Sequence, residues 1–311
     1  MPELPEVETT RRGLQPRIQG RRILRAELRL PKLLRAAPAA GLKALEGRRI
    51  LGLRRRAKHL WMDVEGGWTL CVHLGMSGQL TWWDHACEDS AGFMRHRHTG
   101  LEKTPGQHAP DRHTHFLLHL QGGDRVQYRD PRQFGCLRLL PTAQLELCEP
   151  FKSLGPEPLD PAFTPQAFAQ RLRLRRGRLK ALLLDQHLVA GTGNIYADEA
   201  LFCARLHPLR LAQSLTPGEA EALFASLRAV LEQGIALGGT SISDYVNAEG
   251  KSGGNQEQLK AYGRAGRPCL RCGTALKHTL VSQRSTVFCP HCQPLGSARG
   301  RSPRTKPSKK A

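Results

Sequence analysis

Long apolar runs are missing from this sequence. None of its 311 residues belongs to an uninterrupted apolar stretch of roughly 18 residues, the length that predicts a transmembrane helix. The first residues also lack the apolar core of a secretory signal. We therefore expect a protein that does not enter a membrane and that works in the cytosol.

Acidic and aromatic residues are scarce. The 27 Asp and Glu face 47 Lys and Arg, which leaves a formal charge of +20 and predicts a polyanionic partner. Aromatic residues make up only 5%, which limits how many nucleic-acid bases stacking could hold. Residues 294–311 carry six cations and no acid among glycine, serine and proline, so we expect a basic, disordered tail.

A disulfide framework is not indicated by the nine cysteines. Five of them are scattered and odd in number, which favours a reducing compartment. The other four form two Cys-x-x-Cys pairs, separated by a stretch that reads as a hairpin: Cys269, Cys272, Cys289 and Cys292. Four thiolates at this spacing suit tetrahedral zinc with no open position, and predict one structural Zn²⁺. Arg284 lies near the hairpin tip, well away from the metal.

The N-terminus carries a possible nucleophile. Removal of Met1 leaves the secondary amine of Pro2, part of which is neutral at pH 7 because an α-amino group titrates near 8. Such an amine attacks an aldehyde carbon to give an iminium, and the adjacent Glu3 is a possible acid or base. Alternatively, the prolines only lead into a helix that begins at Pro5 and ends at Gly13.

Residues 23–140 read as mostly strand, with clear strands at 68–73 and 115–120. Lys58 follows three arginines at a strand end, where a solvated basic strand end is the simpler interpretation. Residues 81–114 are polar, rich in histidine and without a metal-ligand spacing, so they predict a surface loop.

Two glycine-containing turns within this region present unusual side chains. Met76 lies at the tip of the first, and Arg132 and Phe134 lie two residues apart on the second. An apolar side chain on a turn can insert between stacked bases, although a methionine in the core is the more common arrangement.

The pattern becomes helical after a Pro-rich linker at 151–165. Residues 171–180 hold six cations, which favours either phosphate contact or a solvated face. A glycine turn at 191–193 opens a helix through Phe202, whose first N–H groups could bind phosphate. An amphipathic helix at 216–237 precedes a Gly-rich segment at 240–258, a candidate mobile lid.

Several short segments, in this order, resemble the formamidopyrimidine-DNA glycosylases. The resemblance spans Pro2 to Gln293 and rests on PELPEVET, RRRAKHL, HLGMSG, DPRQFG, LGPEPL, GTGNIYADE, YGRAGRPC and the four-cysteine hairpin. The opening resembles the purine-directed branch rather than the Pro-Glu-Gly-Pro-Glu of the endonuclease VIII type. The resemblance implies a bifunctional DNA glycosylase and AP lyase that excises 8-oxoguanine and formamidopyrimidines from damaged double-stranded DNA.

The resemblance also implies site roles. Pro2 would attack the sugar and form the Schiff base, and Glu3 would assist base loss and ring opening. Lys58 would lie near the damaged nucleotide, and Arg284 would grip a phosphate during the second of the β- and δ-eliminations. The family implies no catalytic cofactor beyond its structural zinc.

Further residues match the family's DNA contacts. Met76, Arg132 and Phe134 match the side chains that fill the hole left by the extruded base. Matches to backbone contacts are His113, Arg175, Lys180, Asn194 and Tyr262.

The implied architecture is α+β and multidomain, in a monomer of the bacterial cytosol or nucleoid. The predicted units are an N-terminal helix plus β-sandwich (1–145), a helix–two-turns–helix domain with the lid (150–258), a zinc finger (259–293) and the tail (294–311).

Three departures from the family pattern leave alternatives open. The loop at 81–114 is longer than usual, Gln133 replaces a frequent arginine, and Asn255 stands where many members carry an aromatic residue. Asn255 keeps open an endonuclease VIII-like preference for oxidised pyrimidines. A catalytically silent damage-binding protein is a second alternative, but it would not need Pro2, Glu3 and Lys58 together.

Overall fold

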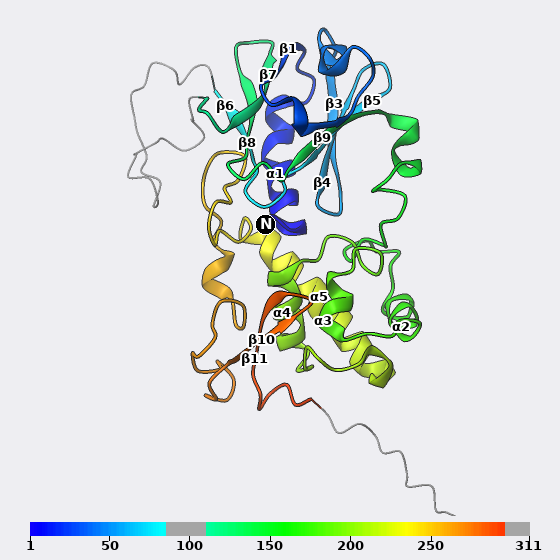
Figure 1. The fold of residues 1–311 in the computed structure, drawn as a ribbon, viewed down its shortest axis with the longest axis vertical. Helices are drawn as coiled ribbons and strands as arrows, with labels where there is room; N and C mark the ends of the chain where they lie inside the picture. The colour runs from blue at the N-terminus through cyan, green and yellow to red at the C-terminus, as the bar shows by residue number, and fades with distance from the viewer. Residues whose placement is uncertain (85–109, 296–311) are drawn as a thin grey trace, which may run out of the picture.

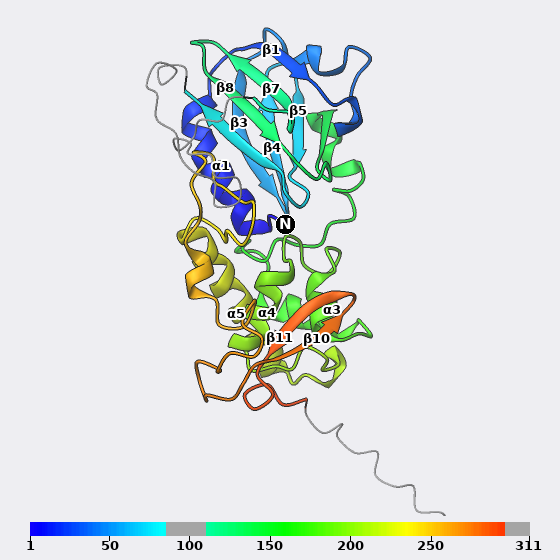
Figure 2. The same cartoon turned by 60° about the vertical axis from the view of Figure 1, so that its left-hand side comes forward.

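The computed structural model describes residues 1–84 and 110–295. It divides into two halves, with an N-terminal helix and two sheets in one and four helices with a two-stranded hairpin in the other (Figure 1). The N-terminus lies where the halves meet (Figures 1 and 2). The architecture is therefore α+β, as the sequence predicts.

Eleven strands and five α-helices are present in the described residues. The α-helices are α1 (Leu4–Ile18), α2 (Pro165–Arg173), α3 (Leu179–Leu184), α4 (Asn194–Cys203) and α5 (Pro217–Ala236). The 3₁₀ helices are Pro31–Leu33, Gly41–Leu45, Thr142–Leu147, Ala212–Ser214 and Asn255–Gln258. The strands are β1 (Ile23–Leu28), β2 (Leu34–Ala36), β3 (Ile50–Arg56), β4 (His59–Val64), β5 (Trp68–His73), β6 (Gln79–Trp83), β7 (Thr114–Leu120), β8 (Arg125–Arg129), β9 (Cys136–Pro141), β10 (Lys277–Val281) and β11 (Arg284–Phe288).

Two sheets form the predicted sandwich. One has the order β1-β7-β8-β6 and the other β2-β9-β5-β4-β3, with β2 and β9 parallel and all other pairs antiparallel. Alternate residues of each strand face inward, as the two-residue period of a strand requires. Phe116 and Val126 of the first sheet therefore share one core with Met62 and Val72 of the second.

Helix α1 is longer than predicted. It continues past Gly13 to Ile18, and its last turns bury Leu14 and Ile18 in the sandwich core. Gly13 lies inside the helix, where its missing side chain leaves room for Ala248: a Cβ at Gly13 would lie 2.8 Å from the Ala248 Cβ. Tertiary packing here overrides the local helix-stop signal.

Two helices of the helical half begin at a capping threonine. The Thr164 side chain accepts a hydrogen bond from Ala167 N at 3.2 Å and begins α2. Thr216 and Glu219 form a capping box that begins α5. Packed aromatic rings of Phe168 and Phe224 join the two helices, with centroids 5.1 Å apart.

The expected loop at 81–114 is shorter at both ends than predicted, because Thr81 belongs to β6 and Thr114 to β7. Residues 85–109, and the tail from 296 onward, lie outside the described residues. Within the described part, no helix has the length and apolar character needed to cross a membrane.

The candidate lid at 240–258 reaches back to the sandwich. Ala248 is part of the sandwich core, and its carbonyl accepts a hydrogen bond from Trp82 N at 2.9 Å. Asn255, only 2% exposed, donates to Thr240 Oγ1 at 2.8 Å. Asn255 therefore stabilises the base of this segment.

Candidate active site

The N-terminal residues are enclosed at the junction of the two halves. Pro2 is buried, and Glu3 is 2% exposed. The Glu3 carboxylate faces the first turn of α4, where Oε1 accepts from Ile195 N at 2.9 Å and Oε2 from Tyr196 N at 3.5 Å. These two N–H groups, at the start of α4, hold the Glu3 carboxyl group in place. They are consequently occupied by Glu3, and the phosphate predicted for this helix start would have to compete with it.

The glycine turn before α4 makes room for these residues. A Cβ at Gly193 would lie 2.3 Å from the Glu3 carboxyl carbon. At Gly191, which has a φ of +89°, a Cβ would lie 2.8 Å from a methyl group of Leu4. Glycine is thus required on steric grounds at two positions of the motif.

A second carboxylate, Glu6, links three elements beneath the N-terminus. Its Oε1 accepts from Tyr196 OH and from Thr240 N, both at 2.8 Å, and its Oε2 accepts from Glu3 N at 2.8 Å. Burial, with a smaller contribution from Glu3, raises the pKa of Glu6 to about 7. Glu6 therefore couples α1 to α4 and to the start of the lid.

Lys58 approaches the same place from the turn between β3 and β4. It is 7% exposed and follows Ala57, whose φ is 53°. Burial lowers the pKa of Lys58, Glu3 and Glu6 oppose that shift, and the charge of Arg284 adds to it. The charges of Glu3, Glu6 and Arg284 thus all act on the buried ammonium group of Lys58.

Glu157, in the linker between the halves, holds this turn. Its carboxylate accepts from the backbone N of Ala57, from Arg55 Nη1 at 2.6 Å and from Arg56 Nη1 at 3.2 Å. Arg55 also contacts Glu8 of α1, with 3.3 Å between Nε and Oε2. The linker and α1 thereby fix the backbone immediately before Lys58.

Arg284 approaches from the other half, on the hairpin of β10 and β11. Ser282 and Gln283 form its two-residue turn with φ angles of 49° and 58°, and Arg284 is exposed directly after it. Positive φ at both turn positions is the geometry that matches the twist of a two-residue hairpin.

Lys180 corrects one of the sequence predictions. Its side chain is fully buried and pairs with Asp198 at 2.6 Å, so it cannot make the expected direct contact with a DNA phosphate. Its ammonium group also donates to Ser285 O at 2.7 Å, next to Arg284 in the hairpin. The cationic pattern of 171–180 did not distinguish this buried lysine from its exposed neighbours.

The two turns that carry Met76 and the Arg132–Phe134 pair lie side by side. Asp130 accepts from Ser77 Oγ at 2.6 Å, and Ser77 Oγ accepts in turn from Arg132 N at 3.1 Å. Phe134 is 58% exposed, with the Arg132 guanidinium 5.1 Å from its ring centroid. Met76 is half-buried. The structure thus joins both turns into one projecting surface.

The remaining predicted DNA contacts are spread over both halves. Arg175 is exposed and His113 is half-buried. Asn194 donates to Ser285 O at 3.0 Å, and the backbone N of Tyr262 donates to Glu199 at 2.9 Å. Asn194 therefore lies next to the Arg284 hairpin and Tyr262 is bound to α4, whereas His113 lies in the sandwich half.

Four acids that organise this site received no role from sequence reasoning. Glu157 and Asp130 hold the turns of the sandwich half, while Asp198 and Glu199 hold the backbone of the zinc-finger region. All four occur inside the quoted motifs, yet most of their partners lie far away in sequence. Only the motif context could have suggested them.

The four predicted zinc ligands gather at the base of the hairpin. Their Sγ atoms all lie within 4.8 Å of one another, with Cys269–Cys292 at 4.0 Å and Cys272–Cys289 at 3.5 Å. Tetrahedral Zn–S bonds of about 2.3 Å place two sulfurs about 3.8 Å apart, so the set fits one zinc ion. With no position left for substrate, this zinc is structural.

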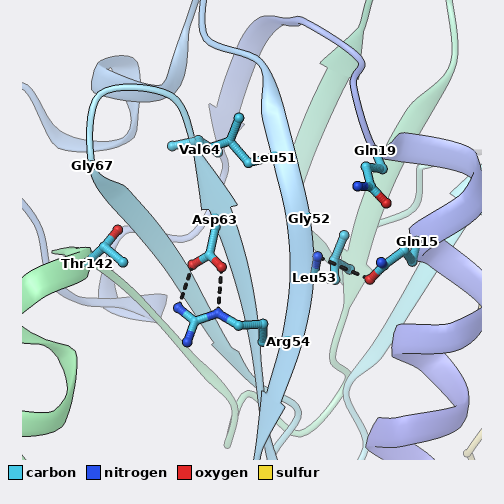
Figure 3. A pocket seen from close by; sticks show the side chains of 10 residues that line it. All are labelled: Gln15, Gln19, Leu51, Gly52, Leu53, Arg54, Asp63, Val64, Gly67 and Thr142. Carbon is cyan, nitrogen blue, oxygen red and sulfur yellow. Dashed lines mark hydrogen bonds and ion pairs between the residues drawn. The ribbon is translucent and has the colours of Figure 1, made fainter.

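A groove between α1 and β3 is separate from this site. It is lined by Gln15, Gln19, Leu51, Gly52, Leu53, Arg54, Asp63, Val64, Gly67 and Thr142. Figure 3 shows the Arg54–Asp63 ion pair and the hydrogen bond from Leu53 N to the Gln15 side chain inside it. None of the predicted site residues contributes to this groove.

The buried Pro2 and Glu3 beside the start of α4, the zinc hairpin and the family matches that follow place the chain in the class of DNA glycosylases of base excision repair with AP lyase activity. Family models match residues 1–137 (Formamidopyrimidine-DNA glycosylase N-terminal domain), 154–246 (Formamidopyrimidine-DNA glycosylase H2TH domain) and 266–295 (Zinc finger found in FPG and IleRS). The chain belongs to the formamidopyrimidine-DNA glycosylase family.

Relatives agree along nearly the whole chain. The formamidopyrimidine-DNA glycosylase of Chloroflexus aurantiacus is 44% identical over 94% of this chain and 98% of its own length. The MutM (Fpg) crystal structure from Thermus thermophilus aligns with a TM-score of 0.80 and 41% identity, covering 95% of this chain and 100% of that one. Lactococcus lactis Fpg bound to DNA containing an abasic site aligns with a TM-score of 0.80 and 33% identity, covering 94% and 99%.

Proposed function

We propose that this protein excises oxidised purines, namely 8-oxoguanine and formamidopyrimidines, from duplex DNA and then cleaves the strand at the resulting abasic sugar. The observation that carries the proposal is the meeting of three segments at the N-terminus. Glu3 bonds to α4, and the charges of Glu3 and Arg284 both act on the buried Lys58, which supports a shared site for the three residues. The protein would act as a monomer in the bacterial cytosol or nucleoid.

The N-terminal amine is the proposed nucleophile. After removal of Met1, the nitrogen lone pair of Pro2 forms a bond to C1′ and the C1′–base bond breaks, with its electrons leaving on the base. Glu3, held against α4, accepts the proton that the Pro2 nitrogen loses and donates it to the ring oxygen O4′ as the C1′–O4′ bond breaks and the sugar opens to the iminium. Loss of a C2′ proton then expels the 3′ phosphate, and a second elimination expels the 5′ phosphate.

The two cations are proposed to hold the phosphates. Burial lowers the pKa of Lys58. The negative charge of a bound phosphate would oppose that shift and favour the protonated form. Arg284 is exposed at the hairpin and can present a two-pronged guanidinium to a second phosphate. Arg175, Asn194, Tyr262 and His113 are proposed as further contacts to the DNA backbone.

The joined turns of Met76, Arg132 and Phe134 are proposed to fill the space that the extruded base leaves. Base extrusion costs a few kcal/mol of stacking, which inserted side chains partly offset. The high exposure of Phe134 supports this role, because a large apolar side chain gains by leaving water.

We also propose the unit boundaries that the sequence predicts: 1–145 for the catalytic sandwich unit, 150–258 for the helical unit with the lid, 259–293 for the zinc finger and 294–311 for the tail. The linker at 151–165 supports the first boundary, since it contains turns but neither a strand nor a helix before Pro165.

A lesion panel with borohydride trapping tests the proposal. Duplexes carrying 8-oxoguanine, a formamidopyrimidine or an oxidised pyrimidine are incubated with the mature protein and with a version that retains a residue before Pro2. The mature protein should form a covalent adduct and cleave purine lesions, and the blocked version should not. Equal trapping by the blocked version would assign the nucleophile to a lysine. Preferred cleavage of pyrimidines, or binding without cleavage, would replace the proposed function with one of the two alternatives.

A further inference from the structure

An ion pair is enclosed between the helical domain and the zinc hairpin. Lys180 of α3 and Asp198 of α4 lie 2.6 Å apart, with side chains 0% and 1% exposed. Burial raises the pKa of Asp198 to about 7 and lowers that of Lys180, while their mutual attraction opposes both shifts. Because both charges lose their hydration, such a pair often stabilises a core no more than apolar residues of similar volume would.

Both members of the pair also bind the backbone of β11. Lys180 Nζ donates to Ser285 O at 2.7 Å, and Asp198 Oδ2 accepts from Val287 N at 3.1 Å. Asn194 Nδ2 donates to the same Ser285 carbonyl at 3.0 Å. These bonds are directional, and the first acts one residue after Arg284.

We propose that Lys180 and Asp198 are positioning residues that set where Arg284 stands relative to the N-terminus. This inference rests on the proposed function, in which Arg284 grips a phosphate of the damaged strand. It replaces the direct DNA contact that the sequence predicts for Lys180 with an indirect role.

The zinc site alone cannot give Arg284 this accuracy. Arg284 lies five residues from Cys289 along an extended strand, so the hairpin projects about 17 Å from the metal. A tilt of about 10° at the metal would move the tip by roughly 3 Å, and a shift of about 1 Å can cost on the order of a hundredfold in rate. The buried pair opposes such a tilt because it holds the strand near its tip.

The test is a double-mutant cycle between Lys180→Met and Arg284→Ala in the full-length zinc-loaded protein, read by single-turnover cleavage of a duplex with an abasic site. With Arg284 present, Lys180→Met should lower the rate about tenfold or more. With Arg284→Ala, the same change should cost less than about twofold. Equal losses in both backgrounds would overturn the proposal, because a general structural defect does not depend on Arg284.

Two further variants keep the test interpretable. Lys180→Met with Asp198→Asn removes both charges and leaves an acceptor for Val287, so it preserves folding if the single variant does not fold. It should still lose Arg284-dependent cleavage. Arg210→Met is the matched control, since it breaks a pair with Glu219 in the same domain without contacting the hairpin. Comparable losses in Arg210→Met would contradict a role specific to the hairpin.

Hydrogen exchange separates this inference from the proposed function. In Lys180→Met, the β11 amides, Val287 above all, should exchange faster while the zinc content stays the same as in the wild-type protein. Unchanged exchange, or loss of zinc, would overturn the positioning role. If the wild-type protein cleaves no lesion or abasic site, the proposed function fails, and the exchange result still decides how the hairpin is held.

Discussion

Two hairpins carry one cation each of the proposed site, and they are held in different ways. The β3–β4 turn places Lys58 from the sandwich half, and the β10–β11 hairpin places Arg284 from the zinc-finger side. The first is held by Glu157, whose side chain is 17% exposed. The second is held by a zinc site at its base and by the fully enclosed Lys180–Asp198 pair near its tip.

The two hairpins are therefore bonded to different parts of the molecule. Glu157 lies in the linker between the halves and accepts a hydrogen bond from Ala57 N, so the linker is bonded directly to the backbone before Lys58. Arg284 is tied to α4, whose first turn also holds Glu3. Arg284 is thus tied to the helical half, whereas Lys58 is tied to the linker through Glu157 and to α1 through Arg55 and Glu8.

The largest effect should come from breaking the second hairpin at its metal. Cys289→Ser removes a thiolate, and structural zinc contributes on the order of 10 kcal/mol to the fold of a small zinc-binding unit. We expect loss of zinc and of DNA binding while the sandwich still unfolds cooperatively. Metal analysis, DNA titration and thermal unfolding of the same sample measure the three outcomes. A purified wild-type protein without zinc would refute the prediction.

A smaller effect is expected from breaking the first hairpin at its acid. Glu157→Ala removes the carboxylate that accepts from Ala57 N, Arg55 and Arg56. At this half-buried position the loss should lower the free energy of unfolding by about 2 kcal/mol. Because Lys58 is displaced, kcat should fall more than KM rises. Glu157→Gln retains the acceptor and should recover part of kcat. Steady-state kinetics of both variants decides, and equal losses would show that charge alone matters.

The pH dependence of stability should reveal the contribution of Glu8, the acid of α1 that contacts Arg55. Burial alone would raise the pKa of Glu8, but hydrogen bonds from Arg11 and Arg12 lower it to about 2 from an ordinary 4.5. The folded state therefore binds this proton less readily than the unfolded chain. Its contribution, on the order of 2 kcal/mol after allowance for solvent screening, is complete above about pH 4.5 and lost as the pH falls toward about 2. Urea unfolding across that range measures it, and Glu8→Gln should remove that part of the slope.

The smallest effect should come from breaking an ion pair of β3 that contacts neither Lys58 nor Arg284. Arg54 and Asp63 pair at 2.6 Å in the groove of Figure 3, with Arg54 47% exposed on its side chain. Arg54→Gln should change the free energy of unfolding by less than about 1 kcal/mol and leave cleavage unchanged. A loss of cleavage comparable to that of Glu157→Ala would mean that strand β3 as a whole, rather than its turn, places Lys58.

The zinc site and the capped helices could be predicted because their signals are local. Cys-x-x-Cys spacing fixes the ligands, and Thr216 with Glu219 fixes the start of α5 within a single helical turn. Lys180 was misassigned because six clustered cations share one pattern, and only the arrival of Asp198 and β11 buries one of them. The helix end predicted at Gly13 was wrong for the same reason, since the Ala248 that packs against Gly13 is distant in sequence.

The roles of Glu157 and Asp198 could not be predicted from spacing. Each binds backbone N–H groups that lie about a hundred residues away, and a backbone partner has no side-chain identity that a sequence pattern could reveal. The resemblance to a family located the site as a whole, whereas the contacts that hold each cation in place required coordinates.

Gly193 has a consequence for how this gene can change. The Glu3 carboxyl group occupies the space that a Cβ at Gly193 would need. The side chains allowed at these two positions, some 190 residues apart, therefore depend on each other. A substitution at Gly193 would act as a mutation of Glu3 without altering it, by displacing that carboxylate from α4. Loss of repair could thus arise from a glycine codon in a gene whose N-terminal codons are all intact, and shortening the Glu3 side chain to Asp is the change to try as a suppressor.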